Sequence, residues 1–560
     1  METDRQLTQQ RARILQQITD LGPMRMGSVC DHHLPTKRKD GSIYRRGPYP
    51  TYTFKQRGKT RGRQLHNQEE AELYRRQIET FRRYQDLADQ LVQVSQRLAD
   101  LEAAGDEGCK KKLQDLIEAE KQAETARIIE RVERDGALDL EAAEFYVRSA
   151  MLAWGASVLE HLLNNVGVGR QDKPRLCARN HLPRKMESCG VREKTIQTIL
   201  GPVRFARSRY VCPACGAVAF PGDALLGVEA TGFSPGLRRL MTRAGSRESF
   251  REAAEDLQLY GAIHVDPKDV ERVAEAMGRR IDDWMVTQAS AALLQARVEP
   301  PGQERIPIFY AELDGTGAPM RKGELIEVRG KGEDGEAKTS EVKLGCVFTQ
   351  TALDEEGRPV RDPASTSYVG AIEQSVDFGY RLHAEAVRRG LLRAERVVVL
   401  SDGAAYNKSI AEKHFPQATH IVDLYHARER LNEFIKNLTQ HPCAGAFHDQ
   451  CLGLLDEGRI EQLAQRLEQE LPRKGKRRGA GLKKIKYFVK RAEQMRYAEF
   501  RRQGFFVGSG VIEAGCKTLI GKRFKNSGMF WSRKGANAII AARCCLYSGR
   551  FEDFWADAAS

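Results

Sequence analysis

Hydrophobic positions in the first part of the chain repeat with a helical period. Five apolar residues recur every three or four positions: Leu87, Leu91, Val94, Leu98 and Leu101. This spacing predicts a helix over 68–103, which forms either a coiled-coil seam or one half of a packed helix pair. Gly105 and Gly108 predict a break in the chain. The helical pattern then returns over 110–166.

The period of the hydrophobic pattern shortens to that of strands in the middle of the chain and then returns to that of helices. Residues 174–220 have the spacing of short strands, whereas 232–296 predict three or more helices. Within the second range, 249–261 and 266–281 are joined by a turn and have the size of a helix-turn-helix. Such a pair either enters a DNA groove or packs as two ordinary helices.

From residue 305 the pattern is that of an α/β domain. Three apolar runs each lead directly into an acidic residue: 306–313, 397–401 and 419–422. Residues 340–350 alternate between apolar and polar side chains, as a strand does. Strand character disappears over 427–505, which predicts an all-helical insertion before the closing helices of 506–560. We therefore predict a multidomain α/β protein.

Two of the acids that follow these runs precede a glycine: Asp314 and Asp402. A carboxylate at the carboxyl end of a strand lies at the rim of the sheet, and glycine permits a sharp turn after it. Two such carboxylates repel each other unless a cation lies between them, and Mg²⁺ or Mn²⁺ suits oxygen ligands. Glu513, one turn into a helix, is the third candidate ligand. A lone Asp-Gly pair would be an ordinary turn, so the prediction of a catalytic metal centre depends on the combination.

The charge of the chain favours a polyanionic partner. Its 560 residues include 90 Lys and Arg against 76 Asp and Glu, a net charge of +14, and each neutralised phosphate releases a counterion. Two segments concentrate the basic residues: 25–63, with interleaved aromatic rings, and 473–491, which has ten Lys and Arg and no acid. Both are predicted to contact DNA, the alternative being a solvated basic loop. The second segment supplies five candidates: Arg473, Lys474, Lys476, Arg477 and Arg478.

No segment of the sequence predicts export or a place in a membrane. No apolar run reaches the roughly 18 residues of a membrane span, and no signal peptide is recognisable. We therefore expect a cytoplasmic protein without a membrane partner. Twelve cysteines in such a chain predict metal ligands and buried thiols rather than disulfides.

One cysteine pair has the spacing of a metal-binding knuckle. Cys212 and Cys215 are separated by two residues, so both thiolates can bind one Zn²⁺ from a tight turn. A structural zinc site needs four ligands, and Cys177 with His181 is the best second half, with Cys189 in reserve. The alternative for the Cys212–Cys215 pair is a redox dithiol, which the absence of a thioredoxin-like βαβ pattern disfavours.

The blocks around the acids resemble the catalytic domain of bacterial insertion-sequence transposases, specifically the ISKra group and its ISLre relatives. They read "LDGTG", "EVKLGCVFT", "VVLSDGAAYN", "HFPQATHIVDLYHARERL" and "GSGVIEAGCKTLIGKRFKNSGMFWS". The resemblance covers roughly residues 150–550. It implies an RNase H-like fold in which Asp314, Asp402 and Glu513 form a DDE triad that cleaves and transfers DNA strands. The first 105 residues resemble a small basic domain that is often fused to such transposases.

Asp423 and His426 are similar to the Asp/Cys-x-x-His signature that several transposase superfamilies share. In those proteins the signature follows the second Asp and opens into a helical insertion, as it does here. The alternative is a strand-to-helix junction held by a side-chain hydrogen bond. The resemblance also implies that the partners are double-stranded DNA, as element terminal inverted repeats and target DNA, and further copies of the chain in a homo-oligomer.

Basic and aromatic residues near Glu513 are candidates for contact with DNA. Lys517 lies one helical turn from Glu513 and either meets a phosphate or pairs with that glutamate. Lys522 and Arg523 follow it. Trp531 either stacks on an unpaired base or is buried against the helix.

These observations predict five parts. A basic module with a long helix (1–105) precedes a helical linker with a zinc-binding hairpin (110–230) and a helix-turn-helix-like region (231–300). An RNase H-like catalytic domain (301–426 and 506–560) is interrupted by a basic helical insertion (427–505). The predicted function is that of a DDE transposase. The alternatives are a metal-dependent nuclease of the same fold without strand transfer, and a non-catalytic DNA-binding regulator derived from a transposase.

Overall fold

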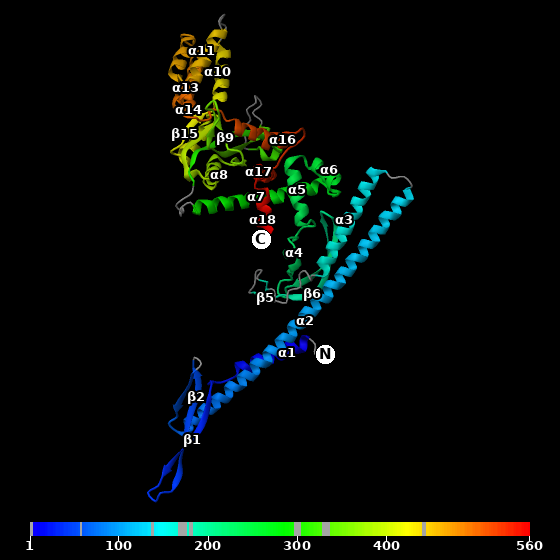
Figure 1. Cartoon of the computed structure of the whole chain (residues 1–560). Helices are drawn as coiled ribbons and strands as arrows, with labels where there is room; N and C mark the ends of the chain where they lie inside the picture. Colours follow the sequence, from blue (N-terminus) through cyan, green and yellow to red (C-terminus); the bar gives the residue numbers. More distant parts are fainter. Residues whose placement is uncertain are drawn as a thin grey trace. The chain divides into compact units, whose positions relative to one another are not determined.

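A computed structural model of the chain divides into two compact units, Met1–Gly167 and Val168–Ser560 (Figure 1). The two units are described separately below. The structure describes residues 4–56, 59–135, 139–165, 176–177, 183–295, 304–326, 337–438 and 444–559.

The first unit combines a three-stranded antiparallel sheet with three helices. Its order along the chain is α1 (Asp4–Thr19), β1 (Ser28–Lys37), β2 (Ile43–Gln56), β3 (Lys59–Gln64), α2 (Gln68–Asp135) and α3 (Leu140–Asn165). Tyr52 of β2 packs edge-on against Tyr74 of α2, with 5.0 Å between the ring centroids. The guanidinium carbon of Arg25 lies 4.0 Å from the centroid of the Tyr74 ring. This cluster fixes the sheet on the first turns of α2.

The apolar seam predicted over 68–103 forms a packed helix pair within the chain. Leu87 and Val94 of α2 are buried against Leu7 and Ile14 of α1. The predicted break at Gly105 and Gly108 is wrong, because α2 continues without interruption from Gln68 to Asp135. Each glycine costs a helix only about 1 kcal/mol relative to alanine, which the surrounding helix-forming residues offset.

The second unit begins with the predicted short strands. They are β4 (Leu176–Cys177), β5 (Arg184–Lys185), β6 (Glu187–Thr198), β7 (Gly201–Val211) and β8 (Val218–Ala219), followed by α4 (Pro221–Leu225). Strands β6 and β7 form a hairpin that turns at Gly201. Asp223, which is buried at the start of α4, accepts hydrogen bonds from Lys194 and Arg207. These ion pairs tie α4 to the hairpin.

Three helices follow, as the sequence predicts: α5 (Pro235–Arg247), α6 (Phe250–Gly261) and α7 (Pro267–Gln295). Helix α6 begins with a capping box in which Ser249 and Glu252 satisfy each other's backbone N–H groups. Helix α7 crosses the later helix α17 at Gly278, where an added Cβ would lie 2.2 Å from the Ala538 carbonyl oxygen. Only glycine allows that close approach.

A mixed sheet of five strands forms the centre of the second unit. Its spatial order is β13-β10-β9-β14-β15. The strands are β9 (Ile306–Pro319), β10 (Thr339–Gln350), β13 (Ser367–Ala371), β14 (Ala394–Ser401) and β15 (Thr419–Val422). β9, β10 and β13 are antiparallel neighbours, whereas β14 and β15 run parallel to β9. Helices α8 (Ser375–Arg388) and α9 (Ala405–His414) connect the strands. The predicted α/β class is therefore confirmed.

One predicted strand end is wrong. β9 does not stop at Asp314 but continues to Pro319, paired throughout with β10. Gly315 and Gly317 lie inside this strand, at positions where neighbouring side chains leave little room for a larger residue. An added Cβ would lie 2.7 Å from Glu341 Oε1 at Gly315 and 2.9 Å from Thr339 Oγ1 at Gly317. These glycines permit close packing rather than a turn.

The region predicted as a helical insertion contains only helices among its described residues. They are α10 (Leu424–Leu438), α11 (Ala444–Asp456), α12 (Ile460–Gln469), α13 (Lys476–Val489) and α14 (Tyr497–Arg502). The chain then returns to the sheet through α15 (Gly510–Gly515), a π-helical turn (Cys516–Gly521) and α16 (Lys522–Phe524). It ends with α17 (Arg533–Tyr547) and α18 (Phe551–Ala559). Among the described helices, none has the length and apolar character that crossing a bilayer requires.

Candidate functional site

Three aspartates form a row across the parallel strands of the central sheet. Ser401 of β14 pairs with Leu313 of β9 on one side and with Val422 of β15 on the other. The next residue on each strand is acidic: Asp314, Asp402 and Asp423. Since residues at equal register in parallel strands lie side by side, the sheet brings three acids together from distant parts of the chain. We call these three residues the acidic row.

Asp402 is held by the loop that follows β14. Its Oδ1 accepts a hydrogen bond from the backbone N–H of Ala404 at 2.9 Å and from Asn407 Nδ2 at 2.8 Å. Asp314 is held less fully, with Oδ1 accepting from its neighbouring Gly315 N–H at 2.7 Å. Burial raises the pKa of Asp314, and the negative charge of Asp402 raises it further. A cation beside the two carboxylates would relieve this repulsion.

Asp423 joins the sheet to the first turn of α10. Its Oδ1 accepts from the backbone N–H of His426 at 2.7 Å and lies 3.1 Å from His426 Nδ1. Its Oδ2 accepts from the backbone N–H of Ser509. Burial opposes ionisation, but the hydrogen bonds from His426 and Ser509 outweigh it and lower the pKa of Asp423. The hydrogen bond to Asp423 in turn raises the pKa of His426 to about 9.

Glu513 reaches this junction from α15. The possible ligand atoms of Asp423, His426 and Glu513 all lie within 4.8 Å of one another, so these residues could hold a metal ion. We call them the oxygen group. Asp314 and Asp402 adjoin the oxygen group through the acidic row, and their charges contribute to the raised pKa of His426. The structure therefore groups Glu513 with Asp423 and His426, the pair with the predicted supporting role, whereas Asp314 and Asp402 are not part of this group.

The oxygen group and the acidic row have the chemistry of a site for a hard divalent cation. Carboxylate oxygens are suitable ligands for Mg²⁺ or Mn²⁺. Lys517 Nζ lies 3.8 Å from Glu513 Oε2, in an ion pair whose lysine is exposed. An exposed pair of this kind contributes little to stability.

A buried acid that the sequence analysis does not identify supports the helix turn that carries Glu513. Glu312 on β9 is fully buried, and its Oε2 accepts from the backbone N–H of Ile512 at 2.8 Å. Burial raises the pKa of Glu312 to about 8. With Asp423 bound to Ser509, two buried acids thus anchor the first turn of the helix that carries Glu513. The sequence signal is a glutamate inside an otherwise apolar strand, two positions before Asp314.

Two residues predicted to contact DNA lie in the core instead. Arg523 is fully buried, and its guanidinium donates to the Gly245 carbonyl oxygen at the end of α5. Trp531 is 6% exposed and packs against the rings of Phe250 and Phe524. Both assignments to DNA contact are corrected, because neither side chain is available at the surface. Burial of Trp531 was one of the two alternatives.

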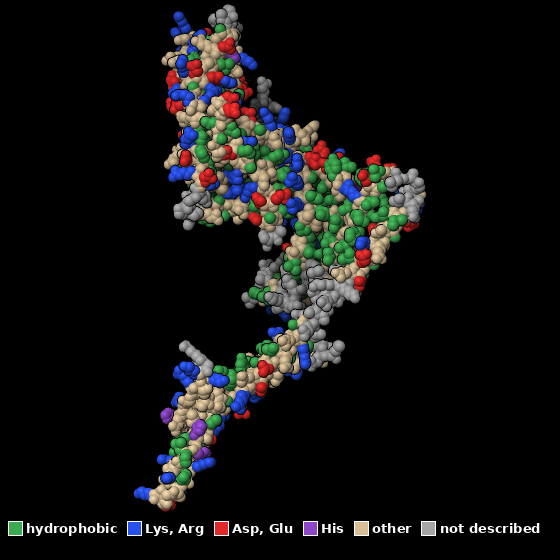
Figure 2. Space-filling model, in the orientation of Figure 1, with side chains coloured by type: hydrophobic (Ala, Val, Ile, Leu, Met, Phe, Trp, Pro, Cys, Tyr) green, Lys and Arg blue, Asp and Glu red, His purple; other side chains and the backbone are tan. Residues whose placement is uncertain are grey.

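The other candidates for DNA contact lie at the surface. Lys522 is exposed, as is Lys517 beside Glu513. Arg473, Lys474, Lys476 and Arg477 are also exposed. Arg478 is partly buried and pairs with Glu468 at 2.7 Å. In Figure 2, Lys and Arg side chains lie among Asp and Glu over the helices α10 to α13. Acidic partners therefore neutralise some of the basic side chains of the helical region, such as Arg478.

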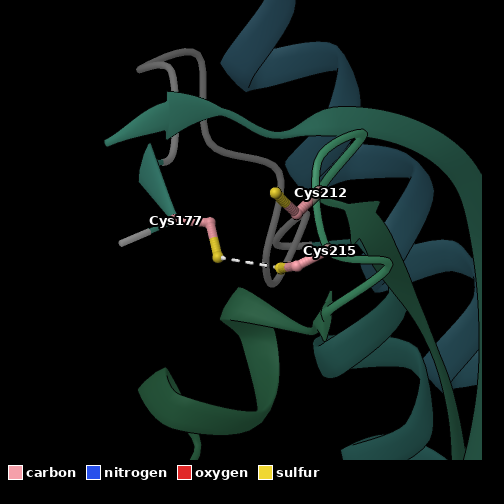
Figure 3. Close-up of side chains that lie close together, drawn as sticks. All are labelled: Cys177, Cys212 and Cys215. Carbon is pink, nitrogen blue, oxygen red and sulfur yellow. Dashed lines mark hydrogen bonds between the residues drawn. The ribbon is translucent and has the colours of Figure 1, made fainter. Parts of the chain in front are cut away.

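Three cysteines form a second cluster, at the base of the β6–β7 hairpin. The Sγ atoms of Cys177, Cys212 and Cys215 lie within 4.8 Å of one another, and those of Cys177 and Cys215 are 3.8 Å apart (Figure 3). We call these residues the sulfur group. Cys212 begins a tight turn in which the N–H of Gly216 donates to its carbonyl oxygen at 2.9 Å. Gly216 has a φ of 69°, which favours glycine.

The turn at Cys212 stabilises the thiolate form of that cysteine. Burial opposes ionisation of Cys212, but the backbone N–H groups of Ala214 and Cys215 stabilise the charged form and lower its pKa to about 7. Thiolates are the form that binds soft or borderline metal ions, so the sulfur group could hold such an ion. His181, the predicted partner of Cys177, lies outside the described residues. Cys189, the reserve ligand, is exposed and lies outside the group.

Comparison with known proteins adds no assignment. No family model matches the chain, and no curated protein matches it.

Proposed function

We propose that the chain is a DDE-type DNA transposase that cleaves and transfers the strands of an insertion sequence. The observation that carries the proposal is the acidic row, in which equal register on β9, β14 and β15 aligns Asp314, Asp402 and Asp423, with Glu513 grouped beside Asp423. An RNase H-like core is the proposed fold. It is supported by the strand order, with three antiparallel neighbours on one side of the sheet and two parallel additions on the other.

In this proposal Asp314, Asp402 and Glu513 hold two Mg²⁺ or Mn²⁺ ions. The ions would activate water or a 3′ hydroxyl and stabilise the leaving oxygen of the phosphodiester. Asp423 orients His426 and the start of α15 through its hydrogen bonds. Glu312 fixes the same helix turn from the strand side. Lys517, whose Nζ lies 3.8 Å from Glu513 Oε2, would meet a phosphate that approaches that glutamate.

The sulfur group is proposed as part of a structural zinc site. Cys177, Cys212 and Cys215 supply three ligands, and His181 is the proposed fourth. Four ligands close a tetrahedral site, and zinc binding would add folding energy to a segment with only a small apolar cluster of its own. The zinc site is thus proposed to hold the hairpin that precedes α5.

The proposed partner is double-stranded DNA, as terminal inverted repeats and as target. Support comes from the net charge of +14 and from the exposed residues Arg473, Lys474, Lys476 and Arg477. The β1–β3 sheet and the α6–α7 pair are further proposed contacts. Joining two element ends requires a homo-oligomer. The proposed location is the cytoplasm, in association with the bacterial nucleoid.

The test uses the full chain with Mn²⁺. Plasmid nicking and joining of paired element-end substrates are measured for the wild type, for Asp402→Asn and for Asp449→Asn, a control at an acid whose side chain is 83% exposed on α11. The wild type and the control should nick and join. Asp402→Asn should lose on the order of a thousandfold in rate, since metal binding supplies several kcal/mol to the transition state.

Two outcomes would favour the rival functions. Nicking without joining would identify a nuclease of the same fold. Equal absence of nicking in the wild type and in Asp402→Asn, with DNA binding intact, would identify a regulator without catalysis.

A further inference from the structure

Two arginines beside the Asp402 loop have no acidic partner. Arg430 is on α10 and Arg491 follows α13, and their guanidinium carbons lie 4.5 and 4.3 Å from the centroid of the Tyr487 ring. Among the described residues neither forms an ion pair, whereas five other arginines of the helical region do: Arg428, Arg459, Arg466, Arg478 and Arg496. Two cations against one ring repel each other, so their arrangement favours a bound anion.

This cluster is tied directly to the acidic row. Arg491 Nη2 donates to the Gly403 carbonyl oxygen at 2.8 Å, and the Tyr487 hydroxyl donates to the Asp402 carbonyl oxygen at 3.4 Å. An added Cβ at Gly403 would lie 2.6 Å from the Tyr487 hydroxyl oxygen. The helical region therefore fits closely against the loop that carries Asp402.

Arg430 also lies on the same side of α10 as the oxygen group. It is four residues after His426, which places both side chains on one face of the helix. The rise between them is about 6 Å. Arg430 is exposed, so its guanidinium can reach a ligand that approaches the acidic row.

We propose that Arg430 and Arg491, stacked on Tyr487, form a binding site for a phosphate of a DNA strand whose neighbouring phosphate lies at the acidic row. This inference rests on the proposed function, since it takes DNA as the substrate. A planar guanidinium can donate two parallel hydrogen bonds to phosphate oxygens. Tyr487 holds both guanidinium groups in place through their contact with its ring. The site assigns a DNA contact to the helical region at its junction with the sheet.

The test measures DNA binding by the full chain without divalent metal. A fluorescein-labelled duplex is titrated over a series of potassium chloride concentrations, and the slope of log K against log salt is determined. Arg430→Gln should reduce the slope by about one and weaken binding roughly eightfold at about 0.1 M salt, the effect of one lost phosphate contact. Arg430 is the sharper position, because a change at Arg491 also releases the Gly403 carbonyl.

Arg393→Gln is the matched control. It removes one positive charge at the opposite end of β14, where Arg393 donates to the Glu304 carbonyl oxygen, and it should leave the slope unchanged. An unchanged slope in Arg430→Gln would overturn the inference. So would an equal loss of slope in both variants, which would indicate only a general effect of charge.

Two further measurements distinguish free phosphate from DNA as the ligand, and failure of this site from failure of the proposed function. If inorganic phosphate raises the melting temperature of the wild type but not of Arg430→Gln, while the DNA slope is the same, the site takes free phosphate and the DNA assignment fails. In Mn²⁺-dependent nicking, Arg430→Gln should raise KM for DNA more than it lowers kcat. Failure of the slope test with nicking intact overturns this site alone, whereas absence of nicking in the wild type overturns the proposed function.

Discussion

The oxygen group and the sulfur group are assembled in opposite ways. The sulfur group joins Cys177 to a pair 35 and 38 residues further along the chain, and a tight turn at Cys212 positions two of its three thiols. The oxygen group and its acidic row draw on residues from 314 to 513. The three aspartates meet because three strands share one register, and Glu513 reaches Asp423 from α15. The Cys212–Cys215 pair can therefore form wherever its turn forms, whereas the acidic row exists only when three strands of the sheet are in register.

The two groups also differ in what surrounds their ligands. Backbone N–H groups favour the charged form of Cys212 and lower its pKa to about 7, below that of an ordinary thiol. The acidic row instead combines burial with mutual repulsion, which raises the pKa of Asp314. We expect the sulfur group to contribute to local stability and the acidic row to trade stability for the ability to bind a cation.

The largest effect is expected at the sulfur group. Cys212→Ser should abolish zinc binding and destabilise the β4–β8 region by on the order of 5 kcal/mol or more, because structural zinc supplies most of the folding energy of such a segment. Zinc content by atomic absorption and protease sensitivity of this region would measure the change. Unfolding of the central sheet, followed by tryptophan fluorescence, should be little affected.

Cys189→Ser is the control for that change, because Cys189 is exposed and lies outside the sulfur group. It should retain zinc. Loss of the central sheet together with the hairpin in Cys212→Ser would contradict the independence of the two groups.

A smaller effect is expected in the sheet that carries the acidic row, as a loss of folding stability on acidification. His420 on β15 lies between Ser401, 3.0 Å from its Nε2, and Gln494, 3.1 Å from its Nδ1. Burial lowers the pKa of His420 to about 4 from its ordinary value near 6.5. The folded state thus favours neutral His420, and stability is lost as pH falls from 6.5 to 4. The full loss is on the order of 3 kcal/mol.

His420→Gln should reduce this dependence on pH, since glutamine stays neutral and keeps both hydrogen-bonding functions. Urea unfolding near pH 7 and near pH 4.5 would measure the difference. His448→Gln, the same substitution on α11 outside the sheet, should keep the behaviour of the wild type. Equal loss of stability on acidification in the wild type and in His420→Gln would refute this account.

The smallest effect concerns the anchor of α15. Glu312→Ala leaves the Ile512 N–H buried without its acceptor, which costs about 2 kcal/mol, and it should weaken Mn²⁺ binding severalfold by releasing the turn that carries Glu513. Glu312→Gln keeps an acceptor oxygen and should stay within about 1 kcal/mol of the wild type. Urea unfolding and calorimetric titration with Mn²⁺ would compare the two variants. Equal Mn²⁺ affinity in both would show that Glu312 does not position Glu513.

The sequence was most informative where local pattern and tertiary structure agree. Asp402 and Asp423 follow apolar runs that are strands, so their place at the sheet edge was predictable. Gly315 was misread as a turn because the crowding by Glu341 arises from another strand. The same limit applies to Arg523, because a lysine-rich stretch gives no sign that one of its arginines is buried. Two further contacts are equally hidden from the sequence, since Tyr487 is distant in the chain from Arg430, and Gly403 from Arg491.

The π-helical turn at Cys516–Gly521 has a consequence for how this segment tolerates insertions and deletions. Such a turn contains one residue more than an α-helical turn. Loss of a single codon within it would rotate every following position by about 100° around the helix axis. Arg523 would then leave the Gly245 carbonyl, while the first turn with Glu513 would keep its anchors. Reading-frame-preserving deletions here should therefore uncouple the acid-bearing turn from the C-terminal helices.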